Sequence, residues 1–176
     1  MRRHWIRWLP LLVLAAGGGA GAAMAASAAT AKPATVEAAN NKTFGTMLVA
    51  ANGHTLYRFL LDKKGVSRCT GACATAWPRL LVKAGVKPTA GAGASASLLG
   101  TIKAAHGMAQ VTYAGYPLYL YAGDNRSGMT TGEGLSSFKA KWYLVNVHGV
   151  LVTKPVKTTS KTTTSTSSSS GGGGWA

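Results

Sequence analysis

The stretch GHTLYRFLLD, residues 53–62, returns 62 residues further along the chain as GYPLYLYAGD, residues 115–124. Such a repeat at a fixed offset defines the folding unit of a chain. Successive strand side chains alternate between faces, so the two aromatic residues of each copy share a face. We therefore predict a turn at glycine, then a strand, then a closing aspartate, in each copy. The equivalent pairs are Gly53 and Gly115, Leu56 and Leu118, Tyr57 and Tyr119, Phe59 and Tyr121, and Asp62 and Asp124.

Short apolar segments between turn residues extend this pattern along the chain. Asn52-Gly53 between two such segments is a strong hairpin signal, because both residues tolerate positive φ. Seven short strands without a helical period predict an all-β domain of antiparallel hairpins, forming one compact sheet or barrel-like domain. The expected strands are residues 47–51, 55–61, 98–105, 108–113, 116–121, 142–147 and 150–153.

Composition divides the chain into four regions. Residues 1–26 are typical of a signal peptide, with a basic start, an apolar stretch and a small-residue run. The apolar stretch is shorter than the ~20 residues of a membrane span, and no cysteine near the cleavage region offers a lipid anchor. We expect a flexible linker over 27–41, the β domain over 42–154 and a disordered Ser/Thr/Gly-rich tail over 155–176. Within the domain the expected limits are 44–84 for repeat one, 84–97 for a flexible loop and 106–153 for repeat two.

The chain is strongly basic, with 19 Lys and Arg against 4 Asp and Glu and a formal net charge of +15. Losing the three arginines of the leader would lower this to +12. Such a surface attracts polyanions, so anionic cell-envelope polymers or a membrane surface are the expected partners. The basic residues are scattered singly rather than gathered in a stripe, which disfavours specific nucleic-acid binding.

Further segments accompany the two repeats: CTGACATAWP at 69–78, QVTYAGYPLY at 110–119 and a later tryptophan, Trp142. With them the chain resembles, from about residue 46 to residue 152, a family of bacterial exported proteins and lipoproteins. That family is defined by a repeated Tyr-x-aromatic-x-x-Asp motif. The resemblance implies export, with a periplasmic, extracellular or cell-wall location, and adds Trp77 and Trp142 to the candidate residues. It implies no activity, since the family is uncharacterised.

Cys69 and Cys73 are the two cysteines of the chain. In an exported protein they are expected to form a disulfide. A reactive dithiol is the alternative, but the C-x-x-C spacing of thioredoxin-like centres is absent. A loop this short gives the disulfide a local role.

The two motif aspartates admit two interpretations. Asp62 and Asp124 could form a pair of acid/base or cation-binding carboxylates brought together by the repeat. We favour turn capping, in which each carboxylate accepts backbone N–H groups from the two to four residues that follow it. Capping explains why the same local sequence recurs at both positions without a distant partner.

The aromatic and histidine residues also admit a structural and a functional interpretation. Tyr57, Tyr119, Trp77 and Trp142 could line a groove for a sugar or an apolar ligand, but aromatics at strand spacing are more often core residues. His54, His106 and His148 each adjoin a glycine and lack the spacing of metal ligands. No standard catalytic motif occurs. We predict no catalytic residue, no metal site and no cofactor.

Two functions from different classes remain. The favoured one is a non-enzymatic binding or structural module that is secreted or resides in the cell envelope. The alternative is an extracytoplasmic redox or electron-transfer accessory that uses the Cys69–Cys73 pair or a bound cofactor. A hydrolase that uses Asp62 and Asp124 is a third possibility.

Overall fold

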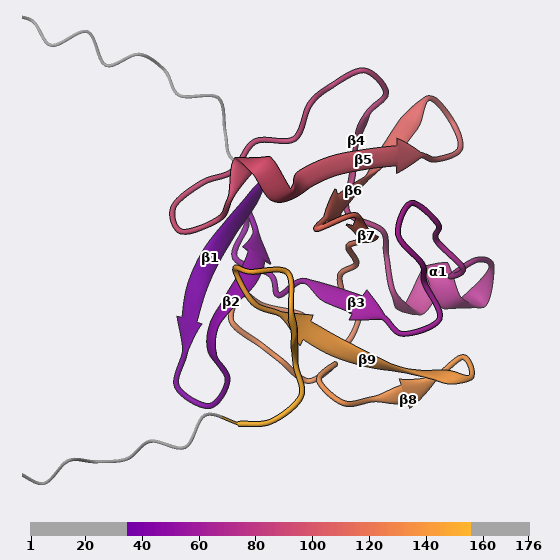
Figure 1. Ribbon diagram of the computed structural model, residues 1–176. Helices are drawn as coiled ribbons and strands as arrows, with labels where there is room; N and C mark the ends of the chain where they lie inside the picture. Colours follow the sequence, from indigo (N-terminus) through magenta and orange to yellow (C-terminus); the bar gives the residue numbers. More distant parts are fainter. Residues whose placement is uncertain (1–34, 156–176) are drawn as a thin grey trace, which may run out of the picture. The chain divides into compact units, whose positions relative to one another are not determined.

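The computed structural model describes residues 35–155, and every element named below lies in that range (Figure 1). The expected signal peptide, the first part of the linker and nearly all of the expected tail lie outside the described residues. No helix in the described range is long and apolar enough to cross a membrane. The strands are β1 (Val36–Asn41), β2 (Gly45–Ala50), β3 (Tyr57–Phe59), β4 (Leu81–Lys83), β5 (Leu99–Lys103), β6 (Met108–Tyr113), β7 (Tyr116–Pro117), β8 (Ser136–Ser137), β9 (Ala140–Val145) and β10 (Leu151–Val152). The helices are α1 (Ala72–Ala76) and the 3-10 turn η1 (Ala96–Leu98).

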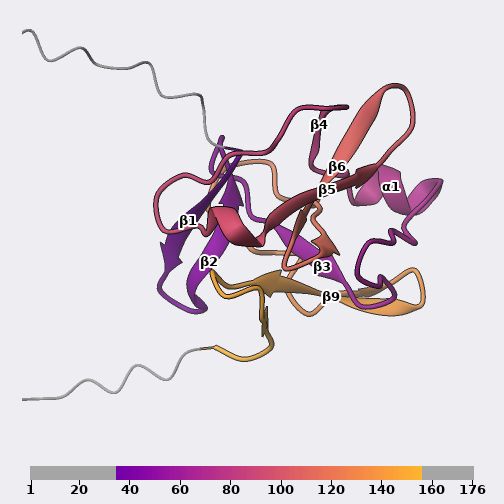
Figure 2. The same ribbon diagram turned by 45° about the horizontal axis from the view of Figure 1, so that its top comes forward.

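The strands form antiparallel sheets, which confirms the predicted all-β class. The β1–β2 hairpin stands alone as a two-stranded sheet. One four-stranded sheet has the order β10-β9-β3, with β8 also paired to β9. The other has the order β4-β6-β5, with β7 also paired to β6. Figure 2 shows β3 and β9 running side by side below the β5–β6 hairpin.

The two repeats meet at the motif tyrosines. Tyr57 and Tyr119 form an antiparallel bridge in which each N–H donates to the other's carbonyl, at 2.8 and 3.0 Å. Around this bridge the β1–β2 hairpin corresponds to β5–β6. Leu144, opposite Tyr57, corresponds to Arg79, which is opposite Tyr119. The repeats are therefore related by an approximate two-fold axis that passes between the two tyrosines.

The two hairpin turns that precede the motif strands differ in length. In repeat one the Ala50 N–H bonds to the His54 carbonyl, so three residues make the turn. In repeat two Tyr113 pairs with Tyr116, and Ala114 and Gly115 alone make the turn, with φ of 50° and 84°. The predicted hairpin at Asn52-Gly53 is confirmed, but only its glycine has positive φ.

The folded part begins earlier than predicted. The expected flexible linker was wrong for residues 36–41, because these form β1 along the whole length of β2. Val36 is fully buried and anchors that strand in the core. The expected flexible loop over 84–97 was also wrong, because its backbone is bonded to β1. The Val36 carbonyl accepts from the Gly91 N–H at 2.8 Å, and the Ala92 carbonyl from the Ala38 N–H at 2.9 Å.

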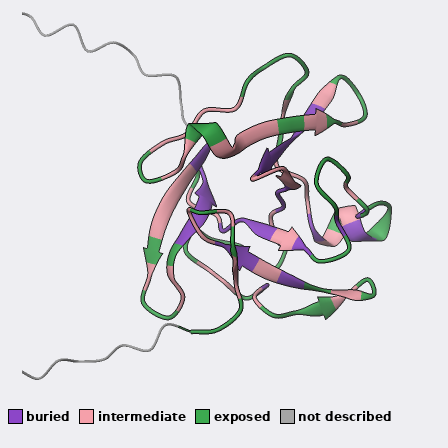
Figure 3. Cartoon of the chain, viewed as in Figure 1, coloured by how far each residue is buried: buried purple, intermediate pink, exposed green. Residues whose placement is uncertain are grey.

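Two hydrophobic clusters fill the interior, and the buried segments of β2, β3, β6 and β9 line them (Figure 3). One cluster gathers the motif aromatics, the tryptophans and the disulfide around Tyr57, Tyr119 and Trp142. The other gathers aliphatic residues, among them Leu56 and Leu118. The motif leucine thus faces one cluster and the motif tyrosine next to it faces the other, as strand alternation requires.

Candidate functional site

The motif tyrosines and aspartates bond across the two repeats. The Tyr57 hydroxyl of repeat one donates to Asp124 Oδ2 of repeat two at 2.5 Å. Reciprocally, the Tyr119 hydroxyl donates to Asp62 Oδ2 at 2.6 Å. Asp62 is 6% exposed and Asp124 3%, so both carboxylates lie in the interior. Each repeat supplies a donor for the buried acid of the other.

The second oxygen of each aspartate holds the loop that follows it. Asp62 Oδ1 accepts the Arg68 N–H at 2.7 Å. Asp124 Oδ1 accepts the Thr131 N–H at 3.0 Å and the Thr131 hydroxyl at 2.5 Å. The expected capping of the next two to four residues was therefore wrong: the bonded residues are six and seven positions along, and a tyrosine of the other repeat completes each site. The local sequence could not show this partner, because it lies more than fifty residues away.

Burial shifts the pKa of Asp62 and of both motif tyrosines. Loss of solvent raises the pKa of Asp62, and the bonds from Tyr119 and Arg68 oppose that shift. Burial, followed by the bond to the neighbouring carboxylate, raises the pKa of both Tyr57 and Tyr119 well above the ordinary tyrosine value. The hydroxyls therefore keep their protons and act as donors. This supports an architectural role for the two aspartates, since both oxygens of each carboxylate already accept a hydrogen bond inside the fold.

The motif glycines complete the exchange between repeats. The Gly65 N–H, three residues after Asp62, donates to the Gly115 carbonyl at 2.9 Å. Its counterpart, the Gly128 N–H, donates to the Gly53 carbonyl at 3.1 Å. A Cβ on Gly53 would lie 2.9 Å from the Ser127 Cβ, so that turn requires the absence of a side chain.

The aromatic residues form a row of four rings through the centre of the fold. Trp77 and Trp142 stack face to face, with centroids 3.8 Å apart and planes at 1°. Phe59 continues the row on the Trp142 side at 4.2 Å, and Tyr121 on the Trp77 side at 4.3 Å. The row thus repeats the internal two-fold relation. Both tryptophans and both motif tyrosines are 1% exposed or less, so the alternative of an open ligand groove lined by these four residues is wrong.

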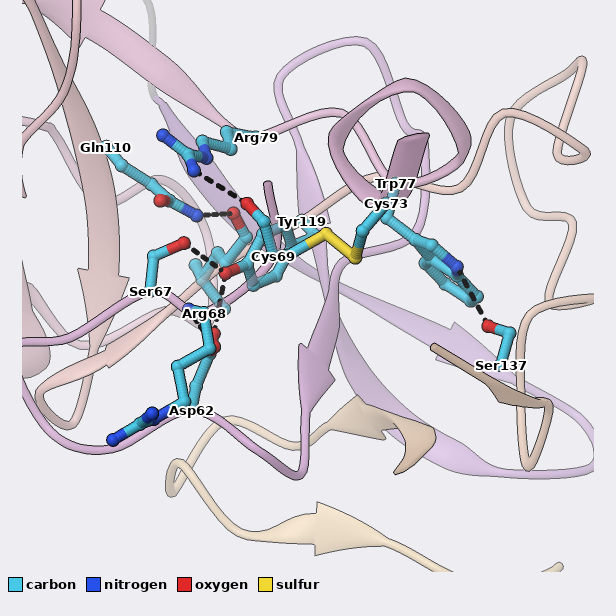
Figure 4. The surroundings of a disulfide bond; sticks show 11 residues. Asp62, Ser67, Arg68, Cys69, Cys73, Trp77, Arg79, Gln110, Tyr119 and Ser137 are labelled. Carbon is cyan, nitrogen blue, oxygen red and sulfur yellow. Dashed lines mark hydrogen bonds between the residues drawn. A yellow bond between two sulfur atoms is a disulfide. The ribbon is translucent and has the colours of Figure 1, made fainter. Parts of the chain in front are cut away.

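The two cysteines are joined. Cys69 and Cys73 form a disulfide with a Cα–Cα distance of 5.2 Å, and both residues are buried against the aromatic cluster. Helix α1 starts at Ala72, inside the disulfide loop. Figure 4 shows the loop fixed on one side by Arg79, whose Nη2 donates to the Cys69 carbonyl at 2.6 Å. At the same end of the loop the Arg68 N–H donates to Asp62 Oδ1.

Some residues that organise the site were not among the sequence candidates. Glu133 Oε2 accepts the Leu144 N–H at 2.6 Å, and burial raises the pKa of this carboxyl. The buried Gln110 amide donates to the Leu118 carbonyl at 3.0 Å. The scarcity of acids in the chain was a usable signal for Glu133, whereas Gln110 carried none.

The outer face of β3 and β9 combines cations with aromatic rings. The Arg58 guanidinium lies over the Tyr116 ring, 3.1 Å from its centroid, and Lys64 Nζ lies 5.9 Å from the same centroid. Arg58 is opposite Tyr143 in the β3–β9 register, and Lys141 precedes Tyr143 by two residues, on the same face. We call these five residues the cation–aromatic face. Burial lowers the pKa of Arg58, and the charge interaction and hydrogen bonding with Tyr116 oppose that shift.

Metal ligands do not gather in the described range. No group of three His, Cys, Asp or Glu residues there could hold a metal ion. The three histidines lie in three different turns, His54 after β2, His106 between β5 and β6, and His148 between β9 and β10.

Comparison with known proteins identifies the repeat. No curated protein and no solved structure matches the chain. A family model described as a secreted repeat of unknown function matches twice, at residues 38–80 and 100–146, which together make up just over half of the chain. Both matches contain the Tyr–Asp motif and the tryptophan of one repeat. The chain therefore belongs to the family of secreted repeats of unknown function.

Proposed function

We propose that this secreted-family protein is a non-enzymatic module of the cell envelope or the extracellular space whose cationic surface binds an anionic polymer. The proposal rests on where the carboxylates of the protein lie. Asp62, Asp124 and Glu133 all accept hydrogen bonds inside the fold, which leaves Glu37 as the remaining acidic side chain between residues 35 and 155. The same range contains thirteen lysine and arginine residues.

A surface of one sign produces a long-range attraction for polyanions and raises their association rate. The cation–aromatic face is the place where this attraction has a defined geometry. Its Arg58, Lys64 and Lys141 supply positive charge, and Tyr116 and Tyr143 supply flat apolar surface beside it. Charge together with aromatic surface suits a polymer that alternates phosphate or carboxylate groups with sugar or polyol units.

The redox alternative receives less support. Cys69 is 0% exposed and Cys73 5%, and thiol–disulfide exchange requires access to a sulfur atom. The hydrolase alternative requires a carboxylate free to act on a substrate, whereas both motif aspartates are buried and engaged with a tyrosine.

Titration of the intact exported chain with poly(glycerol phosphate) at several salt concentrations tests the proposal. The first variant carries Arg58→Gln, Lys64→Gln and Lys141→Gln. The matched control carries Lys42→Gln, Lys103→Gln and Lys154→Gln, which remove the same charge elsewhere. We expect the first variant to bind about tenfold more weakly than the control, a difference of about 1.4 kcal/mol. The salt dependence should also fall more in the first variant, because fewer counterions are released.

Equal weakening by the two triple variants would assign binding to diffuse charge and refute the cation–aromatic face. Failure of the natural chain to bind the polymer even at low salt would refute the polyanion function itself. An uncharged dextran serves as the control polymer, and we expect it not to bind.

A further inference from the structure

A groove lies between helix α1, the segment that leads into β4, and the turn that joins β5 to β6. Its volume is about 580 Å³, within the usual range of small-molecule sites. Its walls are mostly apolar, and they include Thr70, Ala74, Arg79, Leu81, His106 and Met108. We call it the α1 groove. Repeat one lines it at α1 and β4, repeat two lines it at His106 and Met108, and it shares no residue with the cation–aromatic face.

The internal two-fold relation shows what occupies the corresponding place in repeat two. Leu81 of repeat one is opposite Gln110 of repeat two, and Asn146 of repeat two is opposite Met47 of repeat one. The cavity beside Asn146 is smaller, about 380 Å³, and β10 forms part of its lining. Strand β10 pairs with Leu144 and Val145 of β9. In repeat one the chain turns away toward β1 after β4, so no such strand within residues 35–155 pairs with the equivalent Arg79 and Leu80.

A carboxylate present in repeat two is also missing from repeat one. The Leu144 N–H donates to Glu133 Oε2 at 2.6 Å. Arg79 is the equivalent residue in repeat one, and it lies opposite Tyr119. On either side of this pair, the Leu80 N–H donates to the Leu118 carbonyl and the Leu120 N–H donates to the Pro78 carbonyl. In an antiparallel pair of this kind the Arg79 N–H points away from Tyr119. That N–H has no acceptor among residues 35–155. Repeat one therefore has the donor without the acid.

The residue that replaces Glu133 can be identified by counting from the aspartate-bonded N–H groups. These belong to Arg68 and Thr131, and Glu133 stands two residues after Thr131. Two residues after Arg68 stands Thr70, which is exposed and lines the α1 groove. A short neutral side chain thus stands where the other repeat has a carboxylate.

Arg79, which lines the α1 groove, also has a side-chain donor without a partner in the described range. Its Nη2 is engaged with the Cys69 carbonyl, which fixes the guanidinium, whereas its buried Nε has no hydrogen-bond partner in the described part of the chain. A buried donor without a partner is costly, and a ligand oxygen would relieve that cost.

We propose that the α1 groove binds a small apolar molecule bearing a carboxylate, which takes in repeat one the place that the Glu133 carboxylate takes in repeat two. The carboxylate accepts from the Arg79 N–H and Nε–H. The apolar body lies against Ala74, Leu81 and Met108. This site goes beyond polyanion binding, since a compact ligand in a lined groove depends on contact and shape as well as on net charge.

Decanoate is the probe, and its uncharged analogue decanol is the control ligand. The Met108 methyl signal and the His106 ring signals of the intact exported chain report binding in NMR titrations. Thr70→Glu restores the missing acid and should weaken decanoate binding at least tenfold. Thr70→Gln has nearly the same size without the charge and should leave decanoate affinity within about twofold. We expect decanol to bind at least tenfold more weakly than decanoate to the natural chain.

Each result bears on the proposal. Absence of Met108 and His106 shifts with decanoate at millimolar concentration, the range of weak sites, would overturn it. Equal affinity for decanol and decanoate would show an apolar groove without the carboxylate site and would also overturn it. If Thr70→Glu and Thr70→Gln changed decanoate affinity equally, the ligand carboxylate would not take the place of the Glu133 carboxylate, and the proposal would be overturned. Because neither Thr70 variant touches the cation–aromatic face, both should bind poly(glycerol phosphate) about as well as each other, which separates the two hypotheses.

Discussion

A carboxylate in a protein interior is tolerated when hydrogen bonds replace its lost water. Asp62 and Asp124 each receive one such bond from a backbone N–H and one from a tyrosine hydroxyl of the other repeat. Bonds to charged groups contribute about 1.5–3 kcal/mol each, more than bonds between neutral groups. At the scale of single residues, the motif is therefore a pair of interlocking contacts that requires both its tyrosine and its aspartate.

The first prediction concerns this pairing. Tyr57→Phe and Asp124→Asn should each lower the free energy of unfolding by about 2 kcal/mol, since each leaves a buried polar group short of a partner. Their double-mutant cycle should show a coupling of at least about 1 kcal/mol. Tyr57→Phe combined with Asp62→Asn should instead be additive within about 0.5 kcal/mol, because these two residues share no hydrogen bond. Urea denaturation of the natural chain, the three single variants and the two double variants measures both cycles. Coupling within the Tyr57/Asp62 pair instead would contradict the cross-repeat arrangement.

The second prediction follows from the tyrosine ionisation. The pKa of Tyr57 and Tyr119 is raised in the folded state, so their contribution to stability is fully present below the unfolded value of about 10 and is lost as the pH rises above it. Above about pH 10, each of the two tyrosines should lower the free energy of unfolding by about 1.4 kcal/mol per pH unit, because it ionises in the unfolded chain and stays protonated in the folded one. Denaturation midpoints measured from about pH 9 to pH 11 should fall accordingly. Tyr57→Phe should make that fall less steep, and an unchanged slope would disprove the assignment.

At the scale of elements, short segments owe their conformation to neighbours that are distant in the sequence. The segment 36–41 has one strand-favouring residue, Val36, and forms β1 because β2 and the loop at residues 89–92 pair with it. Helix α1 has five residues, too few to display a helical period, and it begins inside the disulfide loop at Ala72 and continues past Cys73. Strands β4 and β8 have three and two residues and depend on β6 and β9. The sequence therefore predicted the strands β2, β3, β5, β6, β7, β9 and β10 and missed β1, β4 and β8.

The third prediction belongs to the disulfide loop. Replacing Cys69 and Cys73 together by serine should lower the free energy of unfolding by about 2 kcal/mol, the chain-entropy value for so short a loop. The domain should remain folded, because Arg79 and Asp62 still hold the loop at Cys69 and Arg68. Thermal unfolding with and without a reductant gives the comparison. Complete unfolding of the double variant would assign the disulfide a global role instead.

At the scale of the whole molecule, the repeats act as one unit. The fixed offset in the sequence predicted two copies of one element and paired the motif tyrosines and aspartates, whereas Trp77 and Trp142 do not share that offset and were added through the resemblance to the family. The offset did not indicate that each tyrosine donates its hydrogen bond to the aspartate of the other repeat. Identical local sequences are compatible with a bond within one repeat and with a bond between repeats, and the Tyr57–Tyr119 pairing decides between them. The cation–aromatic face was missed for the same reason: its members come from three separate segments.

The fourth prediction concerns the exported form of the chain. The leader should be removed near Ala26, after the small-residue run, and the mature chain should carry no lipid. Intact mass of the protein recovered outside the cytoplasm measures both. A mass that includes the leader, or the addition of acyl chains, would contradict the prediction.

The fifth prediction tests whether either repeat can fold alone. The Trp77–Trp142 stack and both Tyr–Asp hydrogen bonds join the two repeats. A fragment that contains one repeat therefore lacks the partner residue of each of these contacts. Fragments covering residues 35–93 and 94–155 should each be unfolded alone, and an equimolar mixture should regain the near-ultraviolet circular dichroism of the stacked indoles. The cut keeps the loop at residues 89–92 with its partner β1. Trp142→Leu in the second fragment should weaken reassembly more than Lys141→Gln, which changes the neighbouring exposed residue. A fragment 35–93 that unfolds cooperatively by itself would show that one repeat is a complete folding unit, and the exchange between repeats would then be an addition to the fold rather than its basis.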